Sequence, residues 1–366
     1  MTKIVDEAEV EIKRRDFEVA KYLSKLAAIL KKGGIGSASQ MLALTDAVIA
    51  AQRQADQEAL RAAEEEEVRA QRLYEYVSLD EWNTLDNVVR EALLNPDLEA
   101  IKPLHFNKQS SASIEWAMWS CNPITGCLHD CPYCYAREIA TSGKFAKAFP
   151  TGFDPTLWPR RLLAARAMSV PKEAMFDTRH KNVFLDSMAD MFGRWVPAEW
   201  IEAVLKMIRE APEWNFLCLT KFPKRMAEFE IPSNAWMGTT VDVQARVKAA
   251  EDAFARVTSN VRWLSCEPLI EPLKFKHLDR FHWMVIGGST ATYDTPPTPE
   301  WRPPFAWIAD LVQQARAAGL KVYFKTNLGI ENRILELPFD APIVGNSATE
   351  APAVFHYLKS AALRDA

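Results

Sequence analysis

From residue 114 onward, short runs of β-branched and aromatic residues alternate with longer amphipathic segments, and this alternation constrains the fold more than any other feature. The predicted strands are Ile114–Trp119, Val183–Leu185, Phe216–Leu219, Ala235–Gly238, Val261–Leu264, Trp283–Ile286 and Val322–Phe324. The predicted helices between them include Pro197–Glu210, Val243–Phe254 and Phe305–Ala318. Strand then helix, repeated six or seven times, predicts an α/β fold with a parallel sheet. With that number of units, we expect closure or partial closure into a (β/α) barrel of six to eight units rather than an open doubly wound sheet. No Gly-x-Gly-x-x-Gly opens a helix after the first strand, which disfavours a Rossmann fold.

The first hundred residues differ in character from the rest. They show apolar positions at three- and four-residue steps and a net charge of -7, whereas the remainder carries +3. We therefore expect an N-terminal α-helical extension over residues 1–100, a linker over 101–113, the barrel over 114–340 and a C-terminal tail or helix over 341–366. The charged stretch AAEEEEVRAQR is interpreted as a solvated helix surface, with a partner-docking arm as the alternative.

Composition limits the class of protein and its compartment. The chain is 48% hydrophobic and 25% charged, which is typical of a globular protein and not of a disordered or fibrous one. Its longest apolar runs fall short of the ~18 residues that span a bilayer, and the first ten residues contain no signal-peptide core. We expect a cytoplasmic protein without a membrane partner, in which clustered cysteines form a metal or redox site.

A cysteine cluster follows the first predicted strand. Cys127, Cys131 and Cys134 form a C-x3-C-x2-C sequence. Three thiolates within eight residues converge on one metal centre only if the backbone loops around it, and Gly126 and Pro132 suit such a loop. A [4Fe–4S] cluster has four irons, so three cysteines leave one iron free to chelate a small molecule.

A structural zinc site is the main alternative, with Cys121 or His129 as the fourth ligand. Zinc motifs usually come as two separated cysteine pairs, and the chain has no second C-x-x-C sequence. A disulfide is disfavoured in a reducing compartment. Cys218 and Cys266 lie within apolar runs and are predicted to be core residues, which is also the simpler interpretation of Cys121.

The cysteine spacing, followed by an aromatic residue, resembles the signature of the radical S-adenosylmethionine (SAM) superfamily. Trp119, Asn122-Pro-Ile-Thr-Gly-Cys127 and Cys131-Pro-Tyr-Cys134-Tyr-Ala136 narrow the resemblance to the phage Gp37/Gp68-like (DUF5131-type) family, a radical-SAM-like group. Further segments agree in order: Val183–Phe192, Leu219–Lys221, Trp236–Gly238, Ser265–Leu269, Val285–Gly288 and Phe324-Lys325. The resemblance covers about residues 114–330.

The resemblance implies a radical-SAM-type barrel that holds a [4Fe–4S] cluster and SAM as cofactors. The open iron would chelate SAM, and the reduced cluster would cleave SAM to a 5′-deoxyadenosyl radical. The implied cofactor-binding residues are Tyr133 for adenine, Asp186 or Ser187 for the SAM ammonium, Lys221 for the SAM carboxylate or a substrate phosphate, and Thr239 and Thr240 for ribose. Glu267 and Lys325, at the ends of the fifth and last predicted strands, are the candidate catalytic residues.

The chain departs from many members of that family in two places. Leu128-His-Asp130 gives a shorter spacing between the first two cysteines, which matches the general radical SAM spacing. Gly287-Gly-Ser-Thr290 stands where many members have Gly-Gly-Glu-Ser, so a carboxylate that might face the substrate is missing.

The expected substrate is a nucleobase, nucleotide or nucleic acid, in phage DNA modification or repair. Candidate nucleic-acid contacts are Lys144, Lys147, Arg160, Arg161, Lys224 and Arg225, near the aromatic residues Phe145, Phe149, Trp158 and Phe222. The expected electron donor is a protein such as flavodoxin or ferredoxin. Two alternatives stay open: a non-enzymatic zinc- or iron–sulfur-binding interaction protein, and an electron relay that does not use SAM.

Overall fold

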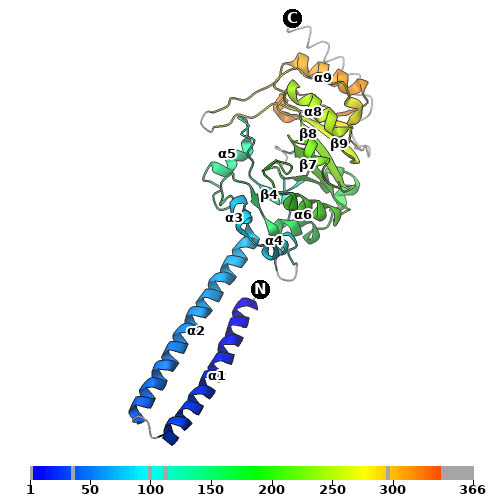
Figure 1. Ribbon diagram of the computed structural model, residues 1–366. Coiled ribbons are helices and arrows are strands. Elements are labelled where there is room, and N and C mark those ends of the chain that lie inside the picture. The colour runs from blue at the N-terminus through cyan, green and yellow to red at the C-terminus, as the bar shows by residue number, and fades with distance from the viewer. Residues whose placement is uncertain (1–2, 34–37, 98–100, 110–113, 294–296, 339–366) are drawn as a thin grey trace. The chain divides into compact units, whose positions relative to one another are not determined.

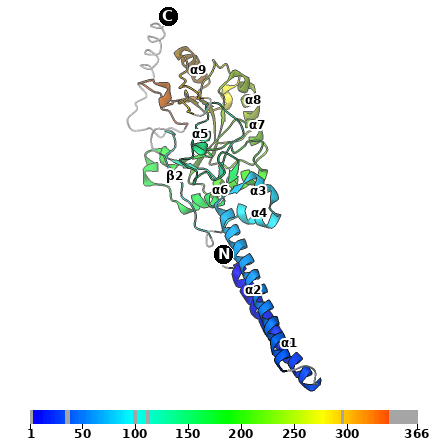
Figure 2. The same cartoon turned by 90° about the vertical axis from the view of Figure 1, so that its left-hand side faces the viewer.

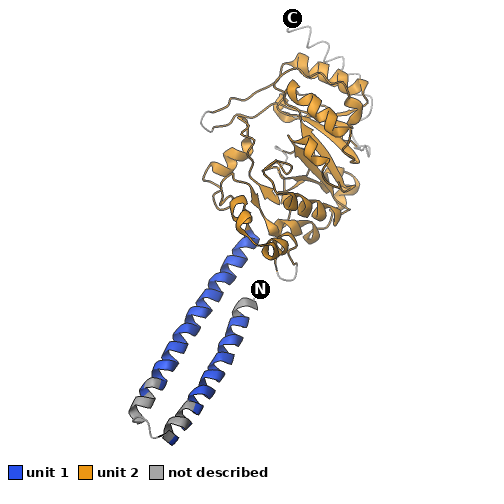
Figure 3. Ribbon diagram, viewed as in Figure 1, with its two compact units in different colours: residues 1–75 blue, residues 76–366 orange. Residues whose placement is uncertain are grey.

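The computed structural model describes residues 3–33, 38–97, 101–109, 114–293 and 297–338. The chain divides into two compact units, residues 1–75 and 76–366 (Figure 3). This division falls earlier than the change of charge near residue 100 suggested. The tail or helix expected over residues 341–366 lies outside the described residues.

Unit 1 is a pair of long helices, α1 (Lys3–Gly33) and α2 (Ala38–Glu75), which run side by side (Figures 1 and 2). Surface ion pairs one helical turn apart, such as Lys13–Glu9 at 3.5 Å, support the helices. Glu64, Glu65 and Glu66 are exposed, which confirms the solvated interpretation of the acidic stretch. No described helix is long and apolar enough to cross a membrane.

Two short helices that were assigned to the N-terminal extension belong to unit 2: α3 (Leu79–Thr84) and α4 (Asn87–Leu94). A capping box begins α3, because the Glu81 amide donates to Ser78 Oγ at 3.2 Å and the Ser78 amide donates to Glu81 Oε2 at 3.1 Å. Trp82 is buried edge-on against Trp200, with ring centroids 5.6 Å apart. This contact ties residues 79–94 to the second unit.

Within the described residues, eight strands form the larger sheet of unit 2, in the order β11-β10-β9-β8-β7-β6-β3-β2. They are β2 (Asn107–Lys108), β3 (Trp119–Cys121), β6 (Asn182–Leu185), β7 (Asn215–Thr220), β8 (Ala235–Thr240), β9 (Val261–Cys266), β10 (Trp283–Ile286) and β11 (Lys321–Phe324). Only β2 is antiparallel to its neighbour; the other pairs are parallel and follow chain order. The α/β prediction is confirmed, but the two edges do not pair in the described residues, so no closed barrel forms.

The remaining elements connect these strands and cover them. The helices are α5 (Tyr135–Thr141), α6 (Ala198–Arg209), α7 (Pro223–Met226), α8 (Gln244–Phe254) and α9 (Phe305–Ala317). Short 3₁₀ helices are η1 (Pro159–Ala167), η2 (Lys172–Met175), η3 (Thr178–Lys181), η4 (Leu278–Arg280) and η5 (Thr326–Leu328). A small antiparallel sheet joins β1 (Val77–Ser78), β5 (Thr156–Leu157) and β4 (Ile124–Thr125). Figure 1 shows α6, α8 and α9 alongside the strands of the larger sheet.

One face of the larger sheet is packed with aromatic side chains. The cluster includes Trp116, Phe184, Trp236, Trp263, Trp283 and Tyr323. Trp263 and Trp283 have ring centroids 5.4 Å apart, and a Cβ at Gly238 would collide with the Trp263 indole, so this glycine provides the space for that ring. Alternate residues on the same strands are buried on the opposite face, as expected for a parallel sheet covered on both sides.

Two predictions about the start of the sheet are wrong. The strand expected over residues 114–119 begins only at Trp119, because Trp116 and Ala117 fill the aromatic cluster instead of pairing with a neighbouring strand. The segment expected to be a linker, residues 101–113, contains the edge strand β2. It also buries Phe106, whose ring lies edge-on to Trp214 at 5.1 Å.

Candidate functional site

The carboxyl ends of the parallel strands meet at one edge of the larger sheet, and polar side chains are buried there. They include Asp186, Asp190, Thr220, Thr239, Thr240, Asp242, Ser265 and Lys325. Buried polar groups are costly unless they are hydrogen-bonded or serve a function. In parallel α/β sheets this edge is also where ligands bind.

The loop between β3 and α5 carries the three clustered cysteines to this edge. β4 pairs with β5, and the Cys127 amide donates to the Phe153 carbonyl at 3.2 Å. Gly126 precedes Cys127 with a φ of 82°, and a Cβ there would collide with the Asp154 carbonyl. Glycine therefore allows the sharp turn that directs Cys127 toward the other two cysteines.

The three thiols are half-buried neighbours. Burial raises the pKa of the Cys127 thiol to about 12, and the nearby thiols of Cys134 and Cys131 act in the same direction. Burial also raises the pKa of Cys131, whereas the Lys221 ammonium lowers it. Two of the sulfurs accept backbone N–H groups: Cys127 from His129, and Cys134 from Arg137 at 3.5 Å as the N-cap of α5. No group of three His, Cys, Asp or Glu side chains is arranged to hold a metal ion in the described residues.

The other cysteines are core residues, as predicted. Cys121, Cys218 and Cys266 are buried and free of disulfide bonds. The Cys121 sulfur lies 3.8 Å from the Arg161 carbonyl, and its charged neighbours are Asp186 and Arg161. The Cys121 sulfur is therefore directed away from the thiols of Cys127, Cys131 and Cys134, and it does not complete a four-ligand zinc site with them.

His129 lies between the first two clustered cysteines but faces the sheet. Its Nε2 is 3.4 Å from Asp190 Oδ2, and its ring stacks on Phe222 with centroids 4.5 Å apart. Asp190 also accepts the Thr220 hydroxyl at 2.6 Å and the Lys221 amide at 2.9 Å. This network ties the cysteine loop to the ends of β6 and β7. The His129 ring is thus in contact with Asp190 and Phe222.

Tyr133, between the second and third clustered cysteines, ties the loop to the end of β8. Its hydroxyl donates to Asp242 Oδ2, and Asp242 forms an ion pair with Arg246 at 2.7 Å. The Lys221 Nζ lies 5.6 Å from the centroid of the Tyr133 ring. Burial and the bond to Asp242 raise the pKa of the Tyr133 hydroxyl. Tyr133 and Lys221, predicted separately from the sequence, are therefore neighbours.

Asp186 is buried directly after β6, with a φ of 49°. Its Oδ1 accepts the Ile124 amide at 2.9 Å, whereas the buried Oδ2 has no hydrogen-bond partner among the residues that the structure describes. Burial raises the pKa of this carboxyl to about 8. Ser187 donates to Asn122 Oδ1 at 3.0 Å. Both residues fasten the segment between β3 and β4, a structural role that the strand-end position alone did not indicate.

The threonines at the strand ends lie side by side. Thr239 is paired with Thr220 across β7 and β8, and its hydroxyl donates to the Thr220 carbonyl at 2.9 Å. Thr240 is buried opposite Ser265 of β9. The structure thus groups both predicted threonines at the middle of the carboxyl edge.

Glu267 and Lys325 meet at the far end of the same edge. Lys325 Nζ is 3.4 Å from Glu267 Oε1 and 4.7 Å from the centroid of the Trp116 ring. Asn327 donates to Glu267 Oε1 at 3.2 Å and exchanges hydrogen bonds with the Gly288 backbone at 2.9 and 3.0 Å. A carboxylate and an ammonium therefore sit together above the aromatic face of the sheet.

Several of the basic residues expected to contact nucleic acid have internal partners. Arg161 donates to the Asn122 carbonyl at 2.8 Å and lies 3.9 Å from the centroid of the buried Trp158 ring. Arg225 donates to the carbonyls of Gly193 and Val196, and Arg160 donates to the Lys102 carbonyl at 2.9 Å. These side chains brace the fold. Those that remain exposed on this list are Lys144, Lys147, Lys224 and Phe145.

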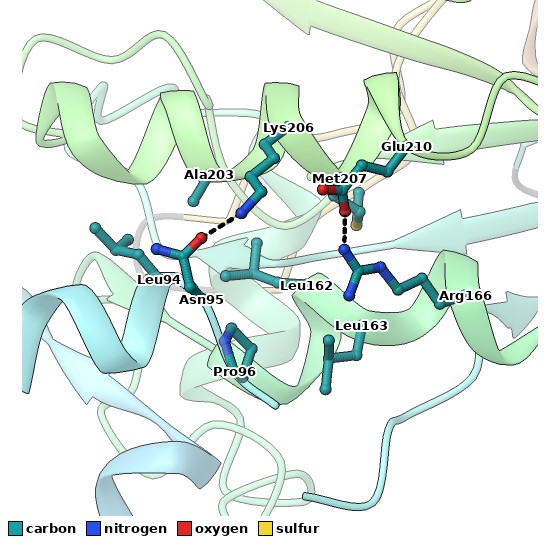
Figure 4. A pocket seen from close by; sticks show the side chains of 10 residues that line it. All are labelled: Leu94, Asn95, Pro96, Leu162, Leu163, Arg166, Ala203, Lys206, Met207 and Glu210. Carbon is teal, nitrogen blue, oxygen red and sulfur yellow. Dashed lines mark hydrogen bonds and ion pairs between the residues drawn. The ribbon is translucent and has the colours of Figure 1, made fainter. Parts of the chain in front are cut away.

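A pocket lies between α4, η1 and the C-terminal half of α6 (Figure 4). An ion pair between Arg166 and Glu210 and a hydrogen bond from Lys206 to Asn95 cross it. The last turns of a helix between parallel strands lie near the amino ends of those strands. This pocket is therefore separate from the cysteine loop and the carboxyl edge.

Fold and site together define an α/β protein whose parallel sheet carries a three-cysteine loop at its carboxyl edge. Residues 111–334 match a family described as "Protein of unknown function (DUF5131)", and the chain belongs to that family. No curated protein matches the chain, and neither does any solved structure.

Proposed function

We propose that this chain is a radical SAM enzyme in which Cys127, Cys131 and Cys134 hold a [4Fe–4S] cluster. The observation that carries the proposal is the position of the three neighbouring thiols, at the carboxyl edge of a parallel sheet whose strands follow chain order. That strand order also favours a partial barrel of the radical SAM type rather than an open doubly wound sheet.

The three thiols are donors of the type that such a cluster uses, although no group of three such side chains is arranged to hold a metal ion in the described residues. Thiolates are the usual ligands of iron–sulfur clusters, and hydrogen bonds to their sulfurs tune the cluster. Backbone N–H groups already point at Cys127 and Cys134. The two candidates for a fourth zinc ligand, Cys121 and His129, face other partners. The set therefore favours a centre with three protein ligands and one open iron.

The residues around the loop suit the binding of SAM. When bound and reduced, such a cluster would supply the one electron needed to cleave SAM to methionine and a 5′-deoxyadenosyl radical. Tyr133 offers a ring to the adenine, and the Lys221 ammonium beside it offers a charge to the SAM carboxylate. Thr239 and Thr240 supply the hydroxyls expected to meet the ribose. Asp186 and Ser187 contribute indirectly, because their hydrogen bonds to Ile124 and Asn122 position the segment that leads into the cysteine loop.

Glu267 and Lys325 are the proposed catalytic pair. Lys325 is buried. Its ammonium group contacts the Glu267 carboxylate and the Trp116 ring, and these contacts hold it in place. Both groups stand at the end of the sheet that a substrate would reach across the carboxyl edge. There they would bind polar groups of the substrate and move a proton to or from it.

The proposed substrate is a nucleobase in a nucleotide or nucleic acid, in the modification or repair of phage DNA. This substrate class is supported by the exposed side chains of Lys144, Phe145 and Lys147. Lysine ammonium groups bind phosphates, and aromatic rings stack on nucleobases. A cytoplasmic location and a donor such as flavodoxin or ferredoxin belong to the same proposal.

The test is anaerobic reconstitution with iron and sulfide, followed by reduction in the presence of SAM. We expect about four irons per chain and production of 5′-deoxyadenosine. Cys127→Ala should abolish that production. Cys121→Ala is the matched control, because it removes a nearby thiol that is not a proposed ligand, and it should retain both the cluster and the product.

Two outcomes would contradict the proposal. Zinc binding without a cluster would favour the non-enzymatic metal-binding interaction protein. A cluster that produces no 5′-deoxyadenosine, with or without DNA or nucleotides, would favour an electron relay. Substrate class is tested separately: single-stranded DNA or a nucleotide should change the rate of SAM cleavage, and no change with either would exclude the nucleobase substrate.

A further inference from the structure

Residues 289–293 and 297–301 form a two-stranded arm that leaves the larger sheet after β10 (Figure 1). Ser289 and Trp301 exchange backbone hydrogen bonds at 2.9 and 3.1 Å. Further out, the Thr292 amide donates to the Thr298 carbonyl at 2.9 Å. An isolated two-stranded ribbon is marginally stable in water, so contacts beyond the ribbon must fix its position.

The base of the arm is fixed to the sheet. A Cβ at Gly288 would collide with the Trp301 carbonyl, and the Gly288 backbone is bonded to the Asn327 side chain. Trp301 Nε1 donates to the Leu269 carbonyl at 2.9 Å. The arm therefore projects in a defined direction from the ends of β9, β10 and β11.

The outer part of the arm contacts the cysteine loop at two points. Thr298 Oγ1 donates to the Pro132 carbonyl at 2.9 Å, directly between Cys131 and Tyr133. The Tyr293 amide donates to Glu138 Oε1 at 2.9 Å, on the helix that Cys134 caps. Each contact depends on one side chain, so each can be removed without altering the backbone of either partner.

We propose that this arm is a strap that holds the cysteine loop against the sheet, with Thr298 and Glu138 as its positioning residues. The Tyr133–Asp242 hydrogen bond and the close approach of His129 to Asp190 connect the loop to the sheet, and the strap adds two contacts from a later part of the chain. The strap thereby restrains the residues between Cys131 and Cys134. Its role in retaining an iron–sulfur cluster rests on the proposed function, whereas its hold on the loop does not.

Hydrogen–deuterium exchange of the full metal-free chain, kept reduced, tests the hold directly. Thr298→Val removes the hydroxyl at nearly constant volume, and Glu138→Ala removes the carboxylate. We expect amides in residues 128–141 to exchange about fivefold faster in each variant, the effect of losing one ordinary hydrogen bond. Thr290→Val, an exposed threonine on the same arm, is the matched control and should leave exchange unchanged.

Conservative variants separate positioning from general loss of structure. Thr298→Ser keeps a hydroxyl donor, and Glu138→Gln keeps an oxygen acceptor, so both should restore exchange close to that of the wild type. Wild-type exchange in Thr298→Val and Glu138→Ala would overturn the proposal. Equal acceleration in Thr290→Val would overturn it too.

The rate of iron loss from the reconstituted protein is a second test of the strap. In Thr298→Val, a chelator should remove iron about fivefold faster than from the wild type. If the wild type forms no cluster, the proposed function fails, yet the exchange experiment still decides whether the strap holds the loop. If a cluster forms and the variant retains it as the wild type does, a role in cluster retention is excluded.

Discussion

The aromatic face of the larger sheet and its carboxyl edge are built from the same strands but hold opposite kinds of side chain. β8 carries Trp236 near its start and Thr239 and Thr240 at its end. β9 carries Trp263 and then ends at Ser265 and Cys266. In β8 and β9 the earlier residues thus pack in the aromatic cluster, whereas polar residues lie at or near the carboxyl end. A substitution of a buried ring on the face should therefore lower the free energy of unfolding more than the loss of one hydrogen bond at the edge.

The largest effect on stability is expected at the aromatic face. Trp263→Ala removes a fully buried indole in contact with the rings of Trp283 and Trp116. We expect the free energy of unfolding to fall by about 3–5 kcal/mol, measured by urea denaturation. Phe176→Ala, whose ring is 80% exposed, is the control and should change it by less than about 0.5 kcal/mol. A loss below about 1 kcal/mol for Trp263→Ala would break the contrast between face and edge.

Asp186, at the edge, should make stability depend on pH. Its pKa in the folded chain is about 8, well above the ordinary value of about 4. Between these values the folded chain retains a proton that the unfolded chain has lost, so stability falls as pH rises through this window. Relative to Asp186→Asn, the wild type should lose up to about 1.4 kcal/mol per pH unit from pH 5 to 8.

Urea denaturation across that pH range measures the difference between the two proteins. Asp154→Asn, which replaces an exposed carboxyl, is the control and should follow the wild type at every pH. A constant difference between wild type and Asp186→Asn from pH 5 to 8 would show that the carboxyl is ionised throughout, against the burial described above.

A smaller effect is expected where the cysteine loop meets β8. Tyr133→Phe removes the hydroxyl that donates to Asp242, while Arg246 remains paired with that carboxylate. We expect a loss of about 1 kcal/mol in the free energy of unfolding. Tyr293→Phe is the matched control, because Tyr293 is 84% exposed, and it should cost nothing measurable. Equal effects in the two variants would mean that the loop is not fastened through Tyr133.

Most strands of the larger sheet were predictable because they are short runs rich in β-branched and aromatic residues. The strand expected over Trp283–Ile286 is found with the same bounds. The first strand was misplaced because Trp116 and Ala117 have strand-like composition but fill the aromatic cluster. The capping box of Ser78 and Glu81 was visible in the sequence and would have placed the start of α3.

The candidate site was predictable in its residue types but not in its contacts. The spacing of the cysteines and the polar strand ends marked the carboxyl edge in advance. The partners of Tyr133 and His129 were not visible, because Asp242 and Asp190 lie far away in sequence and only strand order brings them close. The arm was missed because residues 289–301 hold a mixture of Thr, Pro and aromatic residues typical of a loop.

The order of the strands also sets the order in which the molecule can be assembled. Parallel strands that neighbour one another in the chain can be added singly, starting from the N-terminal side, as the protein is synthesised. Cys134 leaves the ribosome long before Asp242, and Asp242 before Thr298. The contacts of the cysteine loop with Asp242 and Thr298 can therefore form only after these later parts of unit 2 have been made.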